Sequence, residues 1–223
     1  MKRFVYADNA ATTQMDIEVF NAMKPYLLDE YGNASQPYSF SRHGKMGLKE
    51  AREIIASCIN AEPSEIYFTS GGTESDNWAV KGTMFASSEK KTLITSQIEH
   101  HAILRSADSL EHKGFSVVRL EVSKDGIVEP DTLSRTVTHD TQLVSIMFAN
   151  NEIGTIQPIK ELARVAHSKG ALFHTDAVQA IGHIPIDVKE LDVDLLSASA
   201  HKFNGPKGIG FLYIKDEVKI EPY

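Results

Sequence analysis

Short apolar runs alternate with amphipathic segments along most of this chain. The apolar runs have the length of strands, and the amphipathic segments repeat apolar residues every three or four positions, as helices do. Strands are predicted over residues 65–70, 91–96, 115–122, 142–149, 171–176 and 194–199. Helices are predicted over residues 45–60, 74–87, 101–113, 131–137 and 159–169, with Asp131 as an N-cap and Gly170 as a C-terminal stop. This alternation predicts an α/β fold with a mostly parallel sheet flanked by helices.

Polar clusters follow five of the predicted strands. The carboxyl ends of parallel strands lie on one edge of a sheet, where ligands bind, so these clusters should meet in space. The clusters are Ser70-Gly71-Gly72-Thr73, Glu99-His100-His101, Asn150-Asn151-Glu152, Asp176 and His201-Lys202. Five such clusters are hard to explain as ordinary loop composition. The sequence therefore predicts a ligand site at this edge.

Lys202 is the most informative residue of these clusters. It follows the apolar stretch 194–199, and a Gly-Pro-Lys-Gly turn at 205–208 and a second apolar run at 209–214 come after it. A single lysine at a strand end is usually exposed to solvent. A lysine held out of bulk water, however, can lose its proton and condense with an aldehyde, as a pyridoxal phosphate (PLP) enzyme requires. The other clusters favour this second interpretation.

Two further clusters suit a phosphate and a pyridine ring. Gly72 and Thr73 join a strand to a helix, where glycine, free N–H groups and a hydroxyl favour phosphate binding. The alternative is a plain turn with Thr73 as an N-cap. Asp176 could pair with a pyridinium nitrogen, or it could be the N-cap of the segment after it.

The remaining polar positions are less specific. His100 offers a flat ring that can stack on a cofactor and exchange protons near neutral pH, although a lone histidine at a strand end is more often structural. Asn151 belongs to a tandem asparagine pair that suits a tight turn. Gln179 shares a face with Asp176 if a helical turn begins at Ala177. The histidines show no metal-ligand spacing, so no metal site is predicted.

Composition narrows the class of protein. The chain has 223 residues, 42% of them hydrophobic, which corresponds to one large domain or two small ones. The net charge of −7 and the absence of a basic cluster argue against nucleic acid as a partner. No apolar stretch is long enough for a membrane span, and an acidic residue occurs too early for a signal peptide. The single cysteine, Cys58, favours a reducing, cytoplasmic location.

These motifs together resemble the cysteine desulfurases of the class V aminotransferase superfamily, which have the type I PLP-dependent transferase fold. The matching segments occur in the family's order and cover nearly the whole chain. They are Tyr6-Ala7-Asp8-Asn9-Ala10-Ala11-Thr12-Thr13, Gly32-Asn33-Ala34-Ser35, Phe68 to Asn77, Glu99-His100, Asn150 to Gly154, His174 to Gln179 and Ser199-Ala200-His201-Lys202.

The resemblance implies a role for each site residue. Lys202 would carry the Schiff base with pyridoxal 5'-phosphate, and His100 would stack on the ring and act with Lys202 in catalysis. Asp176 would pair with the ring nitrogen, and Gln179 and Asn151 would contact the side of the ring hydroxyl. The residues expected at the phosphate are Gly72, Thr73, Ser199 and His201.

The resemblance also implies an activity and partners. Family members are sulfurtransferases that remove sulfur from L-cysteine, leave alanine and form an enzyme persulfide. They pass the sulfur to acceptor proteins of iron–sulfur cluster, thiamine or tRNA thiolation pathways, and they work as homodimers. A selenocysteine lyase or another class V enzyme is the alternative within the superfamily. A catalytically silent fragment that only binds PLP is the alternative outside it.

One departure from the family is large. Members continue beyond the position matched by Tyr223 with a smaller domain that carries the nucleophilic cysteine. We therefore expect residues 1–223 to form the PLP-binding large domain, with a segment of about residues 1–45 that would pack on the small domain. The isolated chain is expected to be inactive. Cys58 is not expected to replace the missing nucleophile, because its spacing from Leu48, Ala51 and Ile55 predicts a buried position on a helix.

Overall fold

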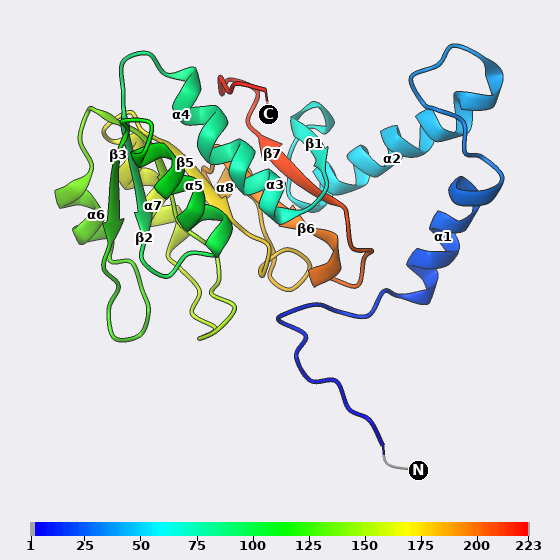
Figure 1. Cartoon of the computed structure of the whole chain (residues 1–223), viewed down its shortest axis with the longest axis horizontal. Coiled ribbons are helices and arrows are strands. Elements are labelled where there is room, and N and C mark those ends of the chain that lie inside the picture. Colours follow the sequence, from blue (N-terminus) through cyan, green and yellow to red (C-terminus); the bar gives the residue numbers. More distant parts are fainter. Residues whose placement is uncertain (1–2, 223) are drawn as a thin grey trace.

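The fold is built around one mixed β-sheet flanked by helices. We describe it from a computed structural model, which defines residues 3–222. The strands are β1 (Ile66–Thr69), β2 (Thr92–Ser96), β3 (Ser116–Leu120), β4 (Thr141–Ser145), β5 (Leu172–Asp176), β6 (Leu195–Ser199) and β7 (Gly210–Ile214). Within the described residues they form a seven-stranded sheet in the order β1-β7-β6-β5-β4-β2-β3 (Figure 1).

The sheet is parallel except at one strand. β2 pairs in parallel with β3 and β4, and the β4–β5 and β5–β6 pairs are also parallel. β7 runs antiparallel to both of its neighbours, β1 and β6, so β1 and β6 point the same way. The prediction of a mostly parallel sheet is therefore confirmed. The carboxyl ends of β1, β2, β4, β5 and β6 face one edge.

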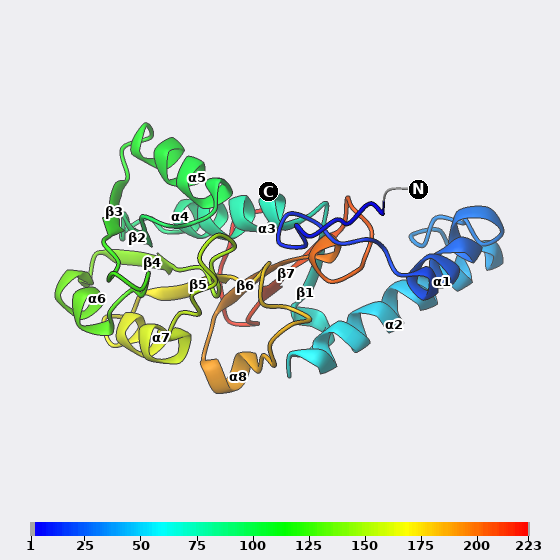
Figure 2. The ribbon, with the colours of Figure 1, turned by 90° about the horizontal axis from the view of Figure 1, so that it is seen from below.

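Helices cover both faces of the sheet. They are α1 (Ile17–Leu28), α2 (Arg42–Cys58), α3 (Gly72–Asn77), α4 (Thr83–Ala86), α5 (His101–Glu111), α6 (Pro130–Thr136), α7 (Ile159–His167) and α8 (Val188–Leu191), with a π-helical segment, η3 (Trp78–Gly82), between α3 and α4. Figure 2 shows α3, α4 and α5 on one face and α6, α7 and α8 on the other. The sheet is thus the middle layer of three.

The apolar runs of the sequence become strands that are buried on both faces. Neighbouring residues along a strand point to opposite faces, so each run supplies two cores. Leu93, Leu143 and Leu195 belong to the core beneath α4 and α5. Ile94, Val144 and Leu196 belong to the core beneath α6 and α7. This double burial explains why the strands appear as continuous apolar runs in the sequence.

Some details of the helices differ from the sequence prediction, including the unpredicted α1 and α8 and the start of α2 at Arg42. Asp131 is not an N-cap, because the helix already begins at Pro130 and Glu129 takes the cap position. Proline suits the first helical position, since its missing N–H would have no partner there. The helix predicted over residues 74–87 begins at Gly72 and runs through η3 to Ala86. The predicted stop at Gly170 is confirmed by its positive φ of 70°.

The N-terminal part of the chain lies at the edge of the fold. α1 buries none of its residues, and α2 extends with α1 away from the sheet (Figures 1 and 2). The extended segment before α1 is nevertheless attached to the loop after β6. Thr13 donates from both its backbone N and its hydroxyl to the carbonyl of His201, and the N–H of Asp16 donates to the carbonyl of Asn204. These bonds place the segment beside the polar strand ends.

In the part of the chain that the structure describes, no helix has the length and apolar character needed to cross a membrane.

Candidate active site

The five polar clusters predicted from the sequence meet in one cavity of about 760 Å³. Its walls are the carboxyl ends of β1, β2, β4, β5 and β6, together with the extended segment before α1. All the residues predicted to hold or work on a cofactor line this cavity. They are Gly72, Thr73, His100, Asn151, Asp176, Gln179, Ser199, His201 and Lys202.

Lys202 reaches the cavity from the short 3₁₀ turn η4 (Ala200–Lys202) that follows β6. The side chain is half-buried, and its Nζ donates to the backbone carbonyls of Ala10 and Ala11, at 3.0 Å from the latter. Loss of solvation lowers the pKa of Lys202, although the charges of Asp176 and Asp8 oppose this shift. A lowered pKa raises the fraction of neutral amine near pH 7, which is the form that attacks an aldehyde.

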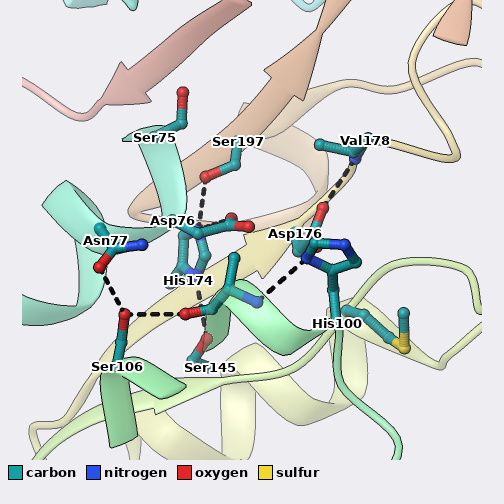
Figure 3. A network of polar contacts seen from close by, with 12 residues as sticks. Ser75, Asp76, Asn77, His100, Ser106, Ser145, His174, Asp176, Val178 and Ser197 are labelled. Atoms are coloured by element: carbon teal, nitrogen blue, oxygen red, sulfur yellow. Dashed lines mark hydrogen bonds and ion pairs between the residues drawn. The ribbon is translucent and has the colours of Figure 1, made fainter. Parts of the chain in front are cut away.

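Asp176 ends β5 and is buried, with only 5% of its surface exposed. One carboxyl oxygen accepts a hydrogen bond from the N–H of Val178 at 3.0 Å (Figure 3). Burial raises the pKa of Asp176, while that hydrogen bond and the charges of His100 and Lys202 oppose the rise. A buried carboxyl group of this kind is suited to pair with a cationic group of a ligand.

His100 stands at the N-terminus of α5, and its Nδ1 accepts the N–H of Ala102 at 3.1 Å. A neutral His100 ring in this bond carries its proton on Nε2. The preceding residue, Glu99, is buried and accepts hydrogen bonds from the Ser96 hydroxyl and the Met147 N–H. Burial raises the pKa of Glu99 to about 8, against the effect of these bonds. Through its hydrogen bond with Met147, Glu99 links the turn at His100 to the segment that follows β4.

The turn between β1 and α3 brings backbone close to the cavity. Gly71 has φ 149°, a region that favours glycine, and α3 begins at Gly72. A Cβ on Gly72 would lie 2.6 Å from Cγ2 of Val178, so a larger residue there would force the Val178 side chain to move. The first N–H groups of a helix have no partner within it, which suits an anion. Ser199 and His201 line the same cavity.

Several lining residues escaped the sequence analysis. They include Ala10 and Ala11, which contribute backbone, and the ionisable residues Asp8, Asp76 and Lys207. Asp76 was detectable in principle, because it lies four residues after Gly72 and therefore shares a helix face with it. Ala10 and Ala11 act through main-chain carbonyls, which leave no pattern in side-chain chemistry.

The prediction that Cys58 is buried is wrong, because its side chain is exposed. The end of α2 packs on the sheet through Ala56 and Ile59, which are buried, with Ile55 at their margin. Cys58 lies beside this stripe instead of on it, and it does not line the cavity.

We expect Cys58→Ser to change the free energy of unfolding by less than about 0.5 kcal/mol, as exposed substitutions usually do. The matched control in the same helix is Ala56→Ser, which buries a hydroxyl group and should cost about 1–3 kcal/mol. Urea unfolding of the two variants measures both values. A Cys58→Ser loss as large as that of Ala56→Ser would contradict the exposed position.

The fold and the lysine- and aspartate-lined cavity are typical of the class-V aminotransferases, and sequence comparison agrees. The family model of the class-V aminotransferases matches residues 5–223, so the chain belongs to that family. Its relatives include cysteine desulfurase IscS of Methanosarcina thermophila, 56% identical over 219 residues that make up 98% of this chain and 54% of the relative. Cysteine desulfurase IscS of Dictyoglomus turgidum is 55% identical over 223 residues, 100% of this chain and 57% of the relative.

Comparison with solved structures agrees with this family assignment. A NifS-like protein superposes with a TM-score of 0.95 at 43% identity, covering 98% of this chain and 60% of that protein. A structure of SspA in complex with cysteine superposes with a TM-score of 0.94 at 40% identity, covering 97% of this chain and 63% of that protein. The chain spans about half the length of the curated relatives it matches.

Proposed function

We propose that this chain binds pyridoxal 5'-phosphate in the cavity and forms the cofactor-binding half of a cysteine desulfurase. The observation that carries the proposal is the joint presence of a half-buried lysine with a lowered pKa and a buried carboxyl group in one cavity. Lysine and carboxyl groups in this combination are what PLP enzymes use to hold the aldehyde and the ring nitrogen.

The residues present fit this cofactor. Gly72 and the helix start behind it provide a close backbone approach for the phosphate, with Thr73, Ser199 and His201 around it. Burial and the nearby positive charges lower the pKa of His201, so its ring is neutral near pH 7. Asn151 and Gln179, which also line the cavity, supply amide groups for the ring hydroxyl, and Nε2 of Gln179 donates a 2.8 Å hydrogen bond to the carbonyl of Ala10.

The reactive side chains of the cavity would have different roles in the reaction. When bound, PLP draws electrons away from the α-carbon of an amino acid substrate. Asp176 would keep the ring nitrogen protonated, which sustains that pull. Lys202 would hold the cofactor through Nζ, and its amine would also accept and return protons near the substrate. His100, whose Nδ1 accepts the N–H of Ala102 and whose Nε2 is left for other contacts, would stack on the ring and exchange protons with the substrate.

The overall reaction proposed is transfer of the sulfur of L-cysteine to a thiol, which gives alanine and a persulfide. The sulfur atom moves to the accepting thiol, and the β-carbon of the substrate receives a proton in its place. Cys58 lies outside the cavity, so we propose that the accepting thiol belongs to another part of the complete enzyme. A sulfur-acceptor protein would then take the persulfide sulfur.

The proposal is tested by adding PLP to the purified chain, dialysing, and recording the visible absorbance. A yellow protein is expected, and L-cysteine should perturb its spectrum more than L-serine does at the same concentration. A chain that stays colourless after reconstitution would reject PLP binding. A spectrum that responds equally to both amino acids would reject cysteine as the preferred substrate.

We also propose that the segment up to about residue 45 packs on the family's smaller domain and near a second subunit; its first two residues lie outside the described part of the chain. The support is the row of exposed apolar side chains on α1, including Ile17, Leu27 and Leu28, each at least 60% exposed.

The isolated chain is therefore expected to self-associate. Sedimentation velocity should show a sedimentation coefficient that rises with protein concentration, because uncovered apolar surface favours association. The double variant Leu27→Glu/Leu28→Glu should lower this tendency, whereas Lys24→Glu on the same helix should not. A strictly monomeric chain across the concentration range would contradict the proposal.

A further inference from the structure

Asp76 has an unusual position for a carboxyl group. It lies on α3, is 1% exposed, and its Oδ1 has no hydrogen-bond partner among residues 3–222. Burial of an ionised carboxylate without a partner is costly, so such a group is normally absent or kept neutral. Asp76 also lines the cavity, which places it next to the chemistry proposed above.

The nearest basic group does not neutralise Asp76. Nε2 of His174 lies 3.9 Å from Oδ1 of Asp76, but both ring nitrogens of His174 are already engaged, by the hydroxyls of Ser145 at 2.9 Å and Ser197 at 3.0 Å. Burial lowers the pKa of His174 to about 3, so the ring carries no charge near pH 7. Figure 3 shows His174 and Asp176 on the two sides of Asp76.

Asp176 is the decisive neighbour. Carboxyl oxygens of Asp76 and Asp176 and a ring nitrogen of His100 all lie within 4.8 Å of one another. Two buried carboxyl groups this close do not both ionise, because each charge raises the cost of the other. Asp176 has the stabilising contacts, from the Val178 N–H and from the charge of Lys202.

Asp76 has no comparable support. Burial raises the pKa of Asp76 well above its usual value, and the charge of Asp176 raises it further. An interaction with the Ser197 hydroxyl opposes this rise without offsetting it. The proton of the pair therefore belongs on Asp76.

We propose that Asp76 is a positioning residue that stays uncharged, carries the proton of the Asp76–Asp176 pair, and leaves Asp176 as the single negative charge facing the cofactor's ring nitrogen. This assignment deepens the proposed function and rests on it for the identity of the cofactor. It also explains how a second acid is tolerated in the wall of the cavity. A neutral Asp76 adds no second charge beside Asp176.

The first test uses the chain without PLP, so it does not depend on the proposed function. Asp76→Asn keeps the shape of the side chain and is neutral at every pH. An unfolded Asp76 loses its proton above about pH 4, whereas the folded, neutral Asp76 retains it. The melting temperature of the wild type should therefore fall relative to Asp76→Asn as the pH rises from 4 to 7.

The control for this test is Thr83→Val. Thr83 is buried, and its hydroxyl has no partner within the described residues, but it has no proton to lose in this range. Its melting temperature should keep a constant offset from the wild type between pH 4 and pH 7. A wild-type melting temperature that stays constant or rises relative to that of Asp76→Asn between pH 4 and pH 7 would mean that folded Asp76 is ionised, which would overturn the proposal.

The second test measures PLP affinity by fluorescence titration. Asp76→Asn should bind within about 3-fold of the wild type. Asp76→Ala, which removes the polar group beside Asp176 and leaves a cavity there, should bind about 10-fold more weakly, because the Asp176 carboxylate is then held less firmly. Equal losses in the two variants would overturn the positioning role. If Asp76→Ala does not fold, the PLP affinity of Asp76→Asn alone tests the proposal, and a loss well above about 3-fold would overturn it. Failure of the wild type to bind PLP would reject the proposed function and leave the pH test of Asp76 intact.

Discussion

Lys202→Ala should abolish retention of PLP by the chain. The variant loses the half-buried amine with a lowered pKa that lines the cavity, and with it the covalent bond to the aldehyde. Its Nζ also contacts the carbonyls of Ala10 and Ala11, so the segment before α1 should loosen at the same time. After reconstitution and dialysis the visible absorbance should fall to the baseline of the apoprotein.

Lys207→Ala is the matched control for this experiment. Lys207 lines the same cavity, but it is exposed to solvent on the loop between η4 and β7. Its variant should stay yellow after dialysis. A Lys202→Ala protein that keeps its colour, or a Lys207→Ala protein that loses it, would contradict the assignment of Lys202.

Asp176→Asn should weaken PLP binding by roughly 10- to 100-fold, the value of one hydrogen bond to a charged group. Asparagine preserves the shape and can still accept the N–H of Val178, but it brings no negative charge to the ring nitrogen. In the complete enzyme the same change should remove most of the rate, because the ring nitrogen would no longer be held protonated.

The measurement is a PLP titration followed by fluorescence, with Asp131→Asn as the control. Asp131 is an exposed acid on α6, and its variant has the same change in net charge. Wild-type affinity in Asp176→Asn would show that the carboxylate does not face the ring nitrogen. An equal loss of PLP affinity in Asp176→Asn and Asp131→Asn would mean that the change in net charge alone weakens binding.

The sequence predicted which polar residues meet at the site, but not the packing contacts around them. Each polar cluster follows an apolar run, and burial on both faces makes such runs into the central strands of a parallel sheet. His100, Asp176 and Lys202 could therefore be placed at one edge without any coordinates. The rule that strand ends share an edge needs only the order and direction of the strands.

Other features depend on contacts that no local pattern records. α1 was not predicted, because it buries none of its residues against the rest of the chain. Cys58 was misplaced because several residues of α2 recur at helical spacing, and only the contact with β1 decides which of them is buried. Asp76 was missed because an acid within a helix is normally exposed, and only the packing of α3 on β6, β7 and α5 buries it.

The most direct test of the account is to reduce the PLP-loaded chain with borohydride, digest it and identify the labelled peptide by mass spectrometry. Reduction makes the bond between the cofactor and its lysine permanent. The account predicts that the mass of the reduced cofactor is found on Lys202 alone. Label on Lys207, or no covalent label in a chain that has bound PLP, would contradict it.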